Sequence, residues 1–151
     1  MKNNKGFSLV ELIIVIAIMA ILVGVMAPQL IKYIEKSKVS SDTQAADAVH
    51  TAILTAMMDP EVVNHSGYNG NFSSLQTAQS VTSLNTGNPI DSAALEILGE
   101  STGAAVNKRL KSTNATDIKF AVVGNNKVSV WVAGSDSRGS KSSSGYFIVI
   151  Q

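Results

Sequence analysis

The chain has 151 residues, a formal net charge of +1 and no cysteine. This length suits one domain rather than two, and the near-neutral charge argues against a basic surface that binds nucleic acid. Without cysteine the chain has no disulfide, no thiolate metal ligand and no thiol nucleophile. Its two histidines, His50 and His65, leave a zinc site short of ligands, so we expect no metal and no cofactor.

The strongest pattern in the sequence is an apolar segment near its beginning. Residues 12–27 contain no charged or polar side chain, and extension back to Phe7 adds Glu11 as the single charge. As a helix, the segment from Phe7 to residue 27 would extend about 32 Å, close to the ~30 Å hydrocarbon core of a membrane. A helix on the surface of a soluble core would show a polar face, so we predict a membrane-inserted helix. Lysines flank the segment on both sides: Lys2, Lys5, Lys32, Lys36 and Lys38.

Three interpretations of this helix remain open: a secretory signal peptide, a plain membrane anchor, and a third that depends on the residues around Glu11. A secretory signal peptide would end in a small-residue cleavage site, which residues 26–30 match poorly. A plain membrane anchor leaves Glu11 unexplained, because a central carboxylate in lipid costs roughly 2.5 kcal/mol or more and such residues tend to be functional. Glu11 lies one turn from Phe7, however, so its side chain could also simply reach the headgroups.

The residues around Glu11 resemble the type III signal of type IV pilins and related pseudopilins. The resemblance rests on Lys5-Gly6-Phe7-Ser8-Leu9-Val10-Glu11-Leu12-Ile13, at the end of a short basic leader and before an uninterrupted apolar helix. Glu11 is the fifth residue after Gly6, and the resemblance covers about residues 1–35. It implies that a prepilin peptidase cuts between Gly6 and Phe7 and that Phe7 becomes the N-methylated first residue of the mature chain.

Glu11 also has a physical role to fill in a filament. Bundled apolar helices exclude water, so an unpaired carboxylate or an unpaired Phe7 ammonium group would be costly there. The resemblance implies that Glu11 pairs with the Phe7 ammonium of a neighbouring subunit, which would neutralise both charges and fix the axial register. The alternative is that Glu11 serves the peptidase only.

Pro28 follows directly after the apolar segment and predicts a kink, because proline donates no amide hydrogen bond and crowds the preceding turn. Gly24, four residues earlier, adds flexibility. A proline at this distance from the cut site is also a feature of type IVa pilins, in which the backbone near it melts on assembly. Ala20 stands where many relatives carry a further glycine.

Helical spacing resumes after Pro28 and continues to Asp59-Pro60, a natural stop. We therefore predict one long helix over residues 7–58, of which 7–27 form the membrane or filament-core part. The second half would pack against a globular head of residues 59–151.

Within the head, residues 59–117 take the place of the variable loop of pilins. The composition of residues 61–89 predicts loop, and short helices are expected at 92–98, between Asp91 as cap and Gly99, and at 104–110. Residues 118–151 predict an antiparallel sheet with strands at 118–123, 128–132 and 146–150, a turn at 124–126 and a mobile loop at 134–144. Burial of Phe120, the valines and Ile148 against the helix would complete an α+β pilin fold.

The sequence thus predicts a structural subunit of a type IV pilus, and the size of its head favours the major pilin. The resemblance implies as partners identical subunits in a helical homopolymer, the prepilin peptidase, and an assembly platform with its ATPase. It places the chain in the cytoplasmic membrane before assembly and in an extracellular filament afterwards. The alternatives are a pseudopilin or minor pilin of a type II secretion-like system, and a membrane-anchored binding module that never polymerises. An enzyme ranks behind these, because no catalytic motif stands out.

Overall fold

The computed structural model describes residues 7–64, 77–123, 127–134 and 146–150 of the chain. The chain divides into two compact units, Met1–Ser37 and Lys38–Gln151. One helix, α1 (Leu9–Met58), begins in the first unit and continues into the second. Its bounds lie close to the expected 7–58. It ends at Met58 because Asp59, held in an extended conformation before Pro60, cannot continue it.

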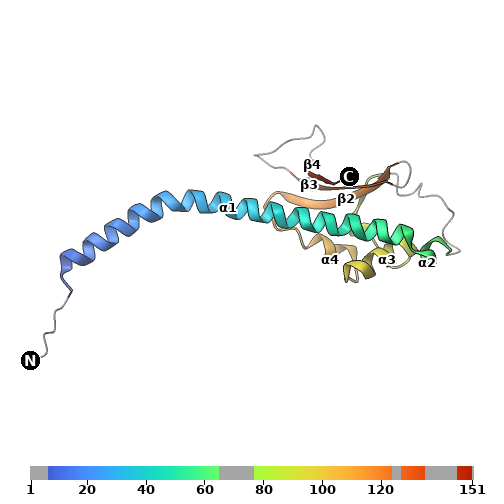
Figure 1. Ribbon diagram of the computed structural model, residues 1–151, viewed down its shortest axis with the longest axis horizontal. Coiled ribbons are helices and arrows are strands. Elements are labelled where there is room, and N and C mark those ends of the chain that lie inside the picture. The colour runs from blue at the N-terminus through green and yellow to red at the C-terminus, as the bar shows by residue number, and fades with distance from the viewer. Residues whose placement is uncertain (1–6, 65–76, 124–126, 135–145, 151) are drawn as a thin grey trace, which may run out of the picture. The chain divides into compact units, whose positions relative to one another are not determined.

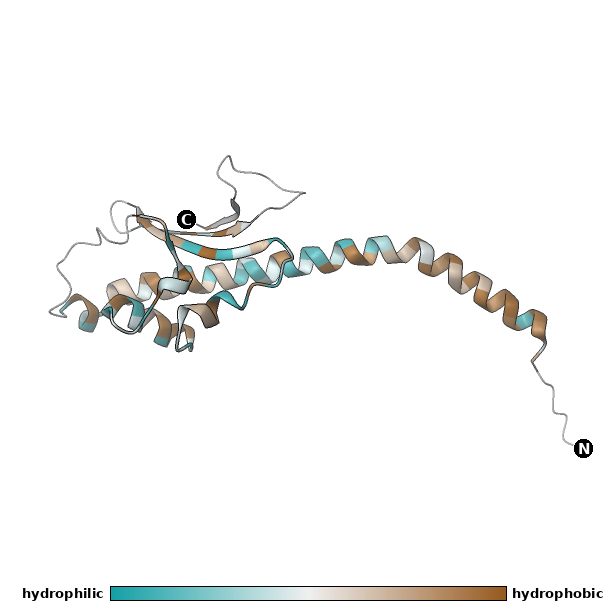
Figure 2. Cartoon of the chain, turned by 180° about the vertical axis from the view of Figure 1, so that it is seen from behind, coloured by the Kyte–Doolittle hydropathy of each residue, from teal (hydrophilic) through white to brown (hydrophobic). Residues whose placement is uncertain are grey.

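The first unit consists of the exposed half of α1. Every described side chain from Phe7 to Ile34 is exposed, and Figure 2 shows hydrophobic residues over most of this stretch. Among the described helices, α1 alone is long and apolar enough to cross a membrane, with a most apolar window of mean hydropathy 3.0 that is 0% buried. No other element of the described chain shields this surface from the surroundings.

The second half of α1 supplies one wall of a hydrophobic core. Its buried residues recur every three or four positions, as expected for one face of a helix. They are Asp42, Ala45, Ala46, Val49, Ala52, Ile53, Ala56 and Met57. The small alanines on this face allow other elements to approach the helix closely.

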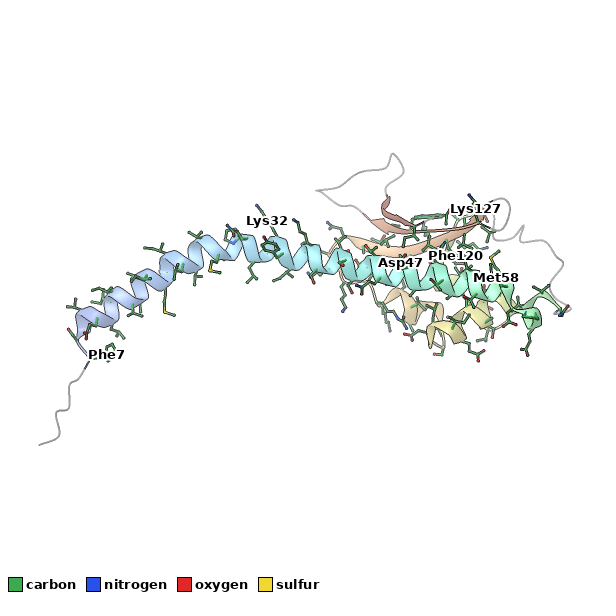
Figure 3. The ribbon with its side chains drawn as sticks, in the orientation of Figure 1. Phe7, Lys32, Asp47, Met58, Phe120 and Lys127 are labelled. Carbon is green, nitrogen blue, oxygen red and sulfur yellow. The ribbon has the colours of Figure 1, made fainter. Side chains whose placement is uncertain are left out.

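A four-stranded antiparallel sheet covers one side of this half of α1. Its order is β1 (Gln79–Ser80), β2 (Ala115–Val123), β3 (Lys127–Gly134) and β4 (Tyr146–Ile150). Alternation of buried and more exposed residues along β3 sends Val128, Val130 and Val132 into the core. Figure 3 shows the fully buried Phe120 of β2 between the sheet and α1.

Two short helices cover the other side of α1, as Figures 1 and 2 both show: α3 (Pro89–Leu98) and α4 (Gly103–Asn107). Helix α3 starts earlier than expected, because the Asn88 side chain accepts the Ile90 N–H at 3.1 Å and therefore caps the helix in place of Asp91. Gly99 ends it in the left-handed conformation with φ 68°, as expected. Helix α4, in contrast, is shorter than the expected 104–110 and begins after Thr102, whose hydroxyl accepts the Ala105 N–H.

The expectation of loop throughout residues 61–89 is wrong for part of the described segment. This stretch contains most of helix α2 (Pro60–Val63), strand β1, the 3₁₀ helix η2 (Val81–Ser83) and the start of α3. Tertiary contact overrides the polar composition here, since Val62, Val81 and Leu84 are buried. The expected turn at 124–126, the loop beyond Gly134 and the side chain of Ile148 lie outside what the structure describes, and β2 begins at Ala115 rather than 118.

Candidate functional site

The start of α1 places Glu11 against the backbone of its own first turn. Ser8 directly precedes the helix, and its backbone N–H donates a hydrogen bond to Oε2 of Glu11 at 2.8 Å. This is one half of a capping box, in which a serine before the helix and a glutamate three residues later satisfy each other's backbone groups. A carboxylate at this end of a helix is also favoured by the helix dipole.

This capping contact was not among the expectations from sequence, although the Ser8-x-x-Glu11 spacing carries its signature. It gives Glu11 a role within its own chain. Glu11 is exposed, and a carboxylate has room for several hydrogen bonds. Its contact with Ser8 therefore leaves capacity for a further donor such as an ammonium group.

Of the two residues at the expected cleavage site, the structure describes Phe7 but not Gly6. Phe7 lies just before the helix and is 84% exposed. Gly6 lies outside the described residues, so the expected cut between Gly6 and Phe7 stays a prediction. Figure 3 labels Phe7 and Lys32, between which Glu11 is the single charged residue of the sequence.

Gly24 and Pro28 occupy consecutive turns of α1, which continues through both residues. Because Pro28 has no N–H, the carbonyl four residues earlier loses its usual helical partner, and that carbonyl belongs to Gly24. A Cβ added at Gly24 would meet no atom within 4 Å. Glycine at this position is therefore not required by packing within the described chain, and the predicted kink remains a prediction.

A buried carboxylate joins α1 to the segment between α4 and β2. Asp42 is 0% exposed and accepts the backbone N–H groups of Lys111 at 2.6 Å and Ser112 at 3.0 Å, together with the Ser112 hydroxyl. These three donors compensate the cost of burying a charge. Sequence reasoning missed this residue because Asp42 lies in a polar stretch of the helix, where exposure is the default expectation.

A second link joins α1 to the sheet. Nε2 of His50 lies 3.0 Å from the carbonyl oxygen of Val128 in β3, and since a carbonyl only accepts, the imidazole donates. This contact gives His50 a structural role. Among the described residues no three His, Asp or Glu side chains are placed to hold a metal ion.

An open groove of about 380 Å³ lies between α1 and α3 in the second unit. It is lined by Asp47, Ala48, Thr51, Ala52, Ile97, Leu98 and Arg109. Arg109 donates to Oε1 of Glu100 at 2.7 Å and to the carbonyl oxygen of Leu98 at 2.8 Å, which fixes the edge of the groove at the end of α3.

Comparison with known proteins agrees with the architecture of the N-terminal segment. Residues 1–27 match the family model of the prokaryotic N-terminal methylation motif. The type IV major fimbrial protein FimA of Dichelobacter nodosus is 43% identical over 56 residues, which are 37% of this chain and 36% of that protein. The N-terminal third of this chain is therefore similar to that of type IV fimbrial proteins.

Two further relatives are fimbrial proteins. That of Moraxella nonliquefaciens is 44% identical over 55 residues, 36% of each chain, and that of Pseudomonas aeruginosa is 37% identical over 59 residues, 39% of this chain and 38% of the relative. The matches span little more than a third of the length of these relatives. No solved structure matches the chain. The resemblance to pilins is thus confirmed for the N-terminal segment, while the description of the head of this chain comes from its own structure alone.

Proposed function

We propose that this chain is a pilin, the major structural subunit of a type IV pilus, held in the cytoplasmic membrane by residues 7–27 and polymerised through the same helix. The observation that carries the proposal is the exposure of the whole apolar half of α1, which contains a single charge, Glu11. A surface this apolar needs lipid or other copies around it. A filament of identical subunits would surround this helix with other copies of itself. Adhesion, motility or DNA uptake would then be functions of the filament.

Residues 1–6 act in this proposal as a leader that prepilin peptidase removes on the cytoplasmic side of the membrane. The cut falls between Gly6 and Phe7, and methylation follows on the new amino group of Phe7. The match of residues 1–27 to the N-terminal methylation motif supports this step. The exposed position of Phe7 ahead of the helix is compatible with access by a processing enzyme.

Glu11 sets the register of the filament in this proposal. Its carboxylate accepts the Ser8 N–H and has capacity for the Phe7 ammonium of a neighbouring subunit. In a bundle of apolar helices this pairing removes two uncompensated charges, and a stagger that separates them would leave both exposed to an apolar environment.

Gly24 and Pro28 provide a weakened turn in the same helix. The carbonyl of Gly24 lacks the N–H that any residue other than proline would offer at position 28. Local unwinding there would cost less than elsewhere in α1, and it would let the apolar half adjust to its neighbours while residues 42–58 stay fixed in the core.

The heads, residues 59–151 together with the second half of α1, form the outer surface of the filament in this proposal. An assembly platform and its cytoplasmic ATPase would drive extraction from the membrane, since the chain itself offers no nucleotide-binding motif. Pilins are structural subunits, and the contacts of His50 and Asp42 in this chain are structural as well.

The test is the intact mass and N-terminal sequence of the protein sheared from the cell surface. A mass that corresponds to residues 7–151 plus one methyl group supports both processing and assembly. A mass that retains residues 1–6, or the absence of the chain from the sheared fraction, contradicts the proposal. A mass that retains residues 1–6 would favour an unprocessed anchor. Processed protein found only in the membrane would favour a pseudopilin.

A further inference from the structure

A row of polar side chains follows Pro28 on one face of α1. Gln29, Lys32, Tyr33 and Lys36 are spaced three and four residues apart, so they share one helix face, which we call the basic stripe. All four residues belong to the first unit and are exposed, Tyr33 by 67%. None of them belongs to the hydrophobic core, so packing within the described chain does not account for the basic stripe.

The charge of this part of α1 is positive. Between residues 12 and 41 the sequence contains three lysines, Lys32, Lys36 and Lys38, and one acid, Glu35, which gives a net charge of +2. Glu35 is half-buried and its Oε2 atom is buried, whereas Lys32 and Lys36 are exposed. Neither of these two lysines forms an ion pair with a described residue. The basic stripe therefore presents two positive charges that an anionic partner would complement.

The basic stripe also lies at a distance from Glu11 that matches the thickness of a bilayer. Lys32 follows Glu11 by twenty-one residues, about 32 Å of helix, and the hydrocarbon core of a membrane is about 30 Å thick. With Glu11 at one boundary of that core, Lys32 and Tyr33 would lie at the other. Tyrosine is enriched at this level because its ring is apolar and its hydroxyl is polar, and a lysine can extend its ammonium group to the headgroups.

A contact within the basic stripe brings its groups together. The Nζ atom of Lys36 lies 5.9 Å from the centroid of the Tyr33 ring, within the range of a cation–π interaction. Lys32 precedes Lys36 by one helical turn on the same face. Two ammonium groups one turn apart, beside a tyrosine, form a set of donors that suits the acceptor oxygens of a phosphate group.

We propose that the basic stripe binds the phosphate groups of anionic phospholipids on the outer side of the cytoplasmic membrane. The inference rests on the proposed function, because it requires residues 7–27 to span the membrane. Removal of residues 1–6 would take away Lys2 and Lys5, so the lysines of the basic stripe would then be the first after the start of the chain. Anionic lipid would thus help to hold the processed subunit in the membrane until a filament takes up its helix.

The test measures the lipid preference of the full-length chain in phosphatidylcholine vesicles that contain a trace of spin-labelled lipid. Electron paramagnetic resonance gives the immobilised fraction of spin-labelled phosphatidylglycerol, relative to that of spin-labelled phosphatidylcholine. We expect the wild type to prefer phosphatidylglycerol, and the double variant Lys32→Gln, Lys36→Gln to lower this preference about twofold or more, since each lysine near a membrane surface favours anionic lipid. The difference should shrink as the salt concentration rises.

Two control variants isolate the position of the charges from their number. Lys108→Gln with Lys111→Gln removes the same charge from two exposed lysines of the head and should leave the lipid preference unchanged. Lys32→Arg with Lys36→Arg keeps both charges and should behave like the wild type. Residues 1–6 are the same in all these proteins, so any contribution from their lysines cancels in the comparison.

A wild type without preference for phosphatidylglycerol, or a glutamine variant of the basic stripe with the full preference, would overturn the inference. If that variant keeps its lipid preference but yields fewer filaments in cells, the basic stripe meets acidic groups of a second copy instead, and the lipid inference is equally overturned. Failure of the proposed function is recognised separately, because the wild-type chain would then not insert into vesicles or would be absent from sheared filaments.

Discussion

The carboxylate of Asp42 accepts the backbone N–H of Ser112 at 3.0 Å, although seventy positions separate the two residues in the chain. The hydroxyl of Ser112 donates to the same oxygen, and the neighbouring Lys111 N–H occupies the other. The contact fixes α1 to the connection between α4 and β2. It is also the first fully buried position of the long helix, because no described residue before Asp42 is buried.

Replacement of Asp42 by alanine should destabilise the head strongly. The substitution leaves two part-buried backbone N–H groups and a hydroxyl without their acceptor, and a buried group without a partner costs about 1–3 kcal/mol. We expect the free energy of unfolding to fall by about 3 kcal/mol or more, measured by thermal or denaturant unfolding of the detergent-solubilised full chain.

Two control variants separate this contact from a general effect of charge removal. Asp47→Ala removes an exposed carboxylate five residues further along α1 and should change stability little. Asp42→Asn keeps one acceptor oxygen and should have an intermediate effect. If Asp42→Ala and Asp47→Ala unfold alike, the buried carboxylate does not hold the head together.

Substitution of Glu11 by glutamine distinguishes its two roles. Glutamine can still accept the Ser8 N–H, since capping boxes use either side chain, but it cannot neutralise an ammonium group. We expect both Glu11→Gln and Glu11→Ala to abolish filaments while the protein remains in the membrane, as judged by electron microscopy and fractionation. Normal filaments from the glutamine variant would show that capping, rather than charge pairing, is what assembly requires.

Gly103→Ala should destabilise the head because there is no room for its side chain. A Cβ at this position would lie 1.8 Å from the carbonyl oxygen of Val81, so α4 or η2 would have to move. Strain of this kind costs about 1–3 kcal/mol, which unfolding of the full chain can measure. The same substitution at Gly24, where a Cβ meets nothing within 4 Å, is the control and should leave unfolding of the head unchanged.

Asp91 predicts a pH dependence of stability. Burial raises the pKa of its carboxyl above 3.8, although a hydrogen bond with the backbone of Asn85 acts in the opposite direction. Because the folded chain then binds the proton more tightly than the unfolded chain, this residue contributes stability below pH 3.8 that is lost as the pH rises through the folded-state pKa.

Asp91→Asn should therefore raise the melting temperature at neutral pH, where the wild-type carboxylate is ionised and buried. The advantage should shrink as the pH falls through the folded-state pKa and should be gone below pH 3.8, because the wild-type carboxyl is then protonated in both the folded and the unfolded chain. Melting curves of the two proteins across this range check the expectation, and a constant difference at all pH values would contradict it.

Local signals in the sequence were sufficient for the long elements of this fold. The stop of α1 at Met58 follows from Asp59-Pro60, and the end of α3 follows from Gly99. Strand β4 has the expected bounds, because a short apolar run after a Ser- and Gly-rich stretch is a clear strand pattern.

The remaining elements depend on contacts that no local pattern contains. The two-residue strand β1 exists through its pairing with β2, Gln79 opposite Phe120 and Ser80 opposite Lys119. Asp42 is a polar residue in a polar stretch, and its partners lie 69 and 70 positions away. The groove likewise needs α1 and α3 side by side before it can be recognised.

At the candidate site the sequence pointed to Glu11 through its charge and its distance from Gly6. The three-residue spacing between Ser8 and Glu11 also indicates a helix cap. This role was not among the expectations, which followed the resemblance to pilins. The structure therefore adds a local role for Glu11, while its role between subunits stays a proposal.

The burial pattern of α1 makes the folding of the head independent of what surrounds the apolar half of the helix. The buried residues of the helix all lie from Asp42 onward and the partly buried Val39 packs against the same core, whereas no residue from Phe7 to Ile34 is buried within the described chain. Under the proposed function, a subunit can therefore wait in the membrane with its head already complete. Growth of the fibre then requires only that one helix exchange lipid for protein neighbours, so incorporation can be repeated, and reversed, without refolding the part of the molecule that faces the outside.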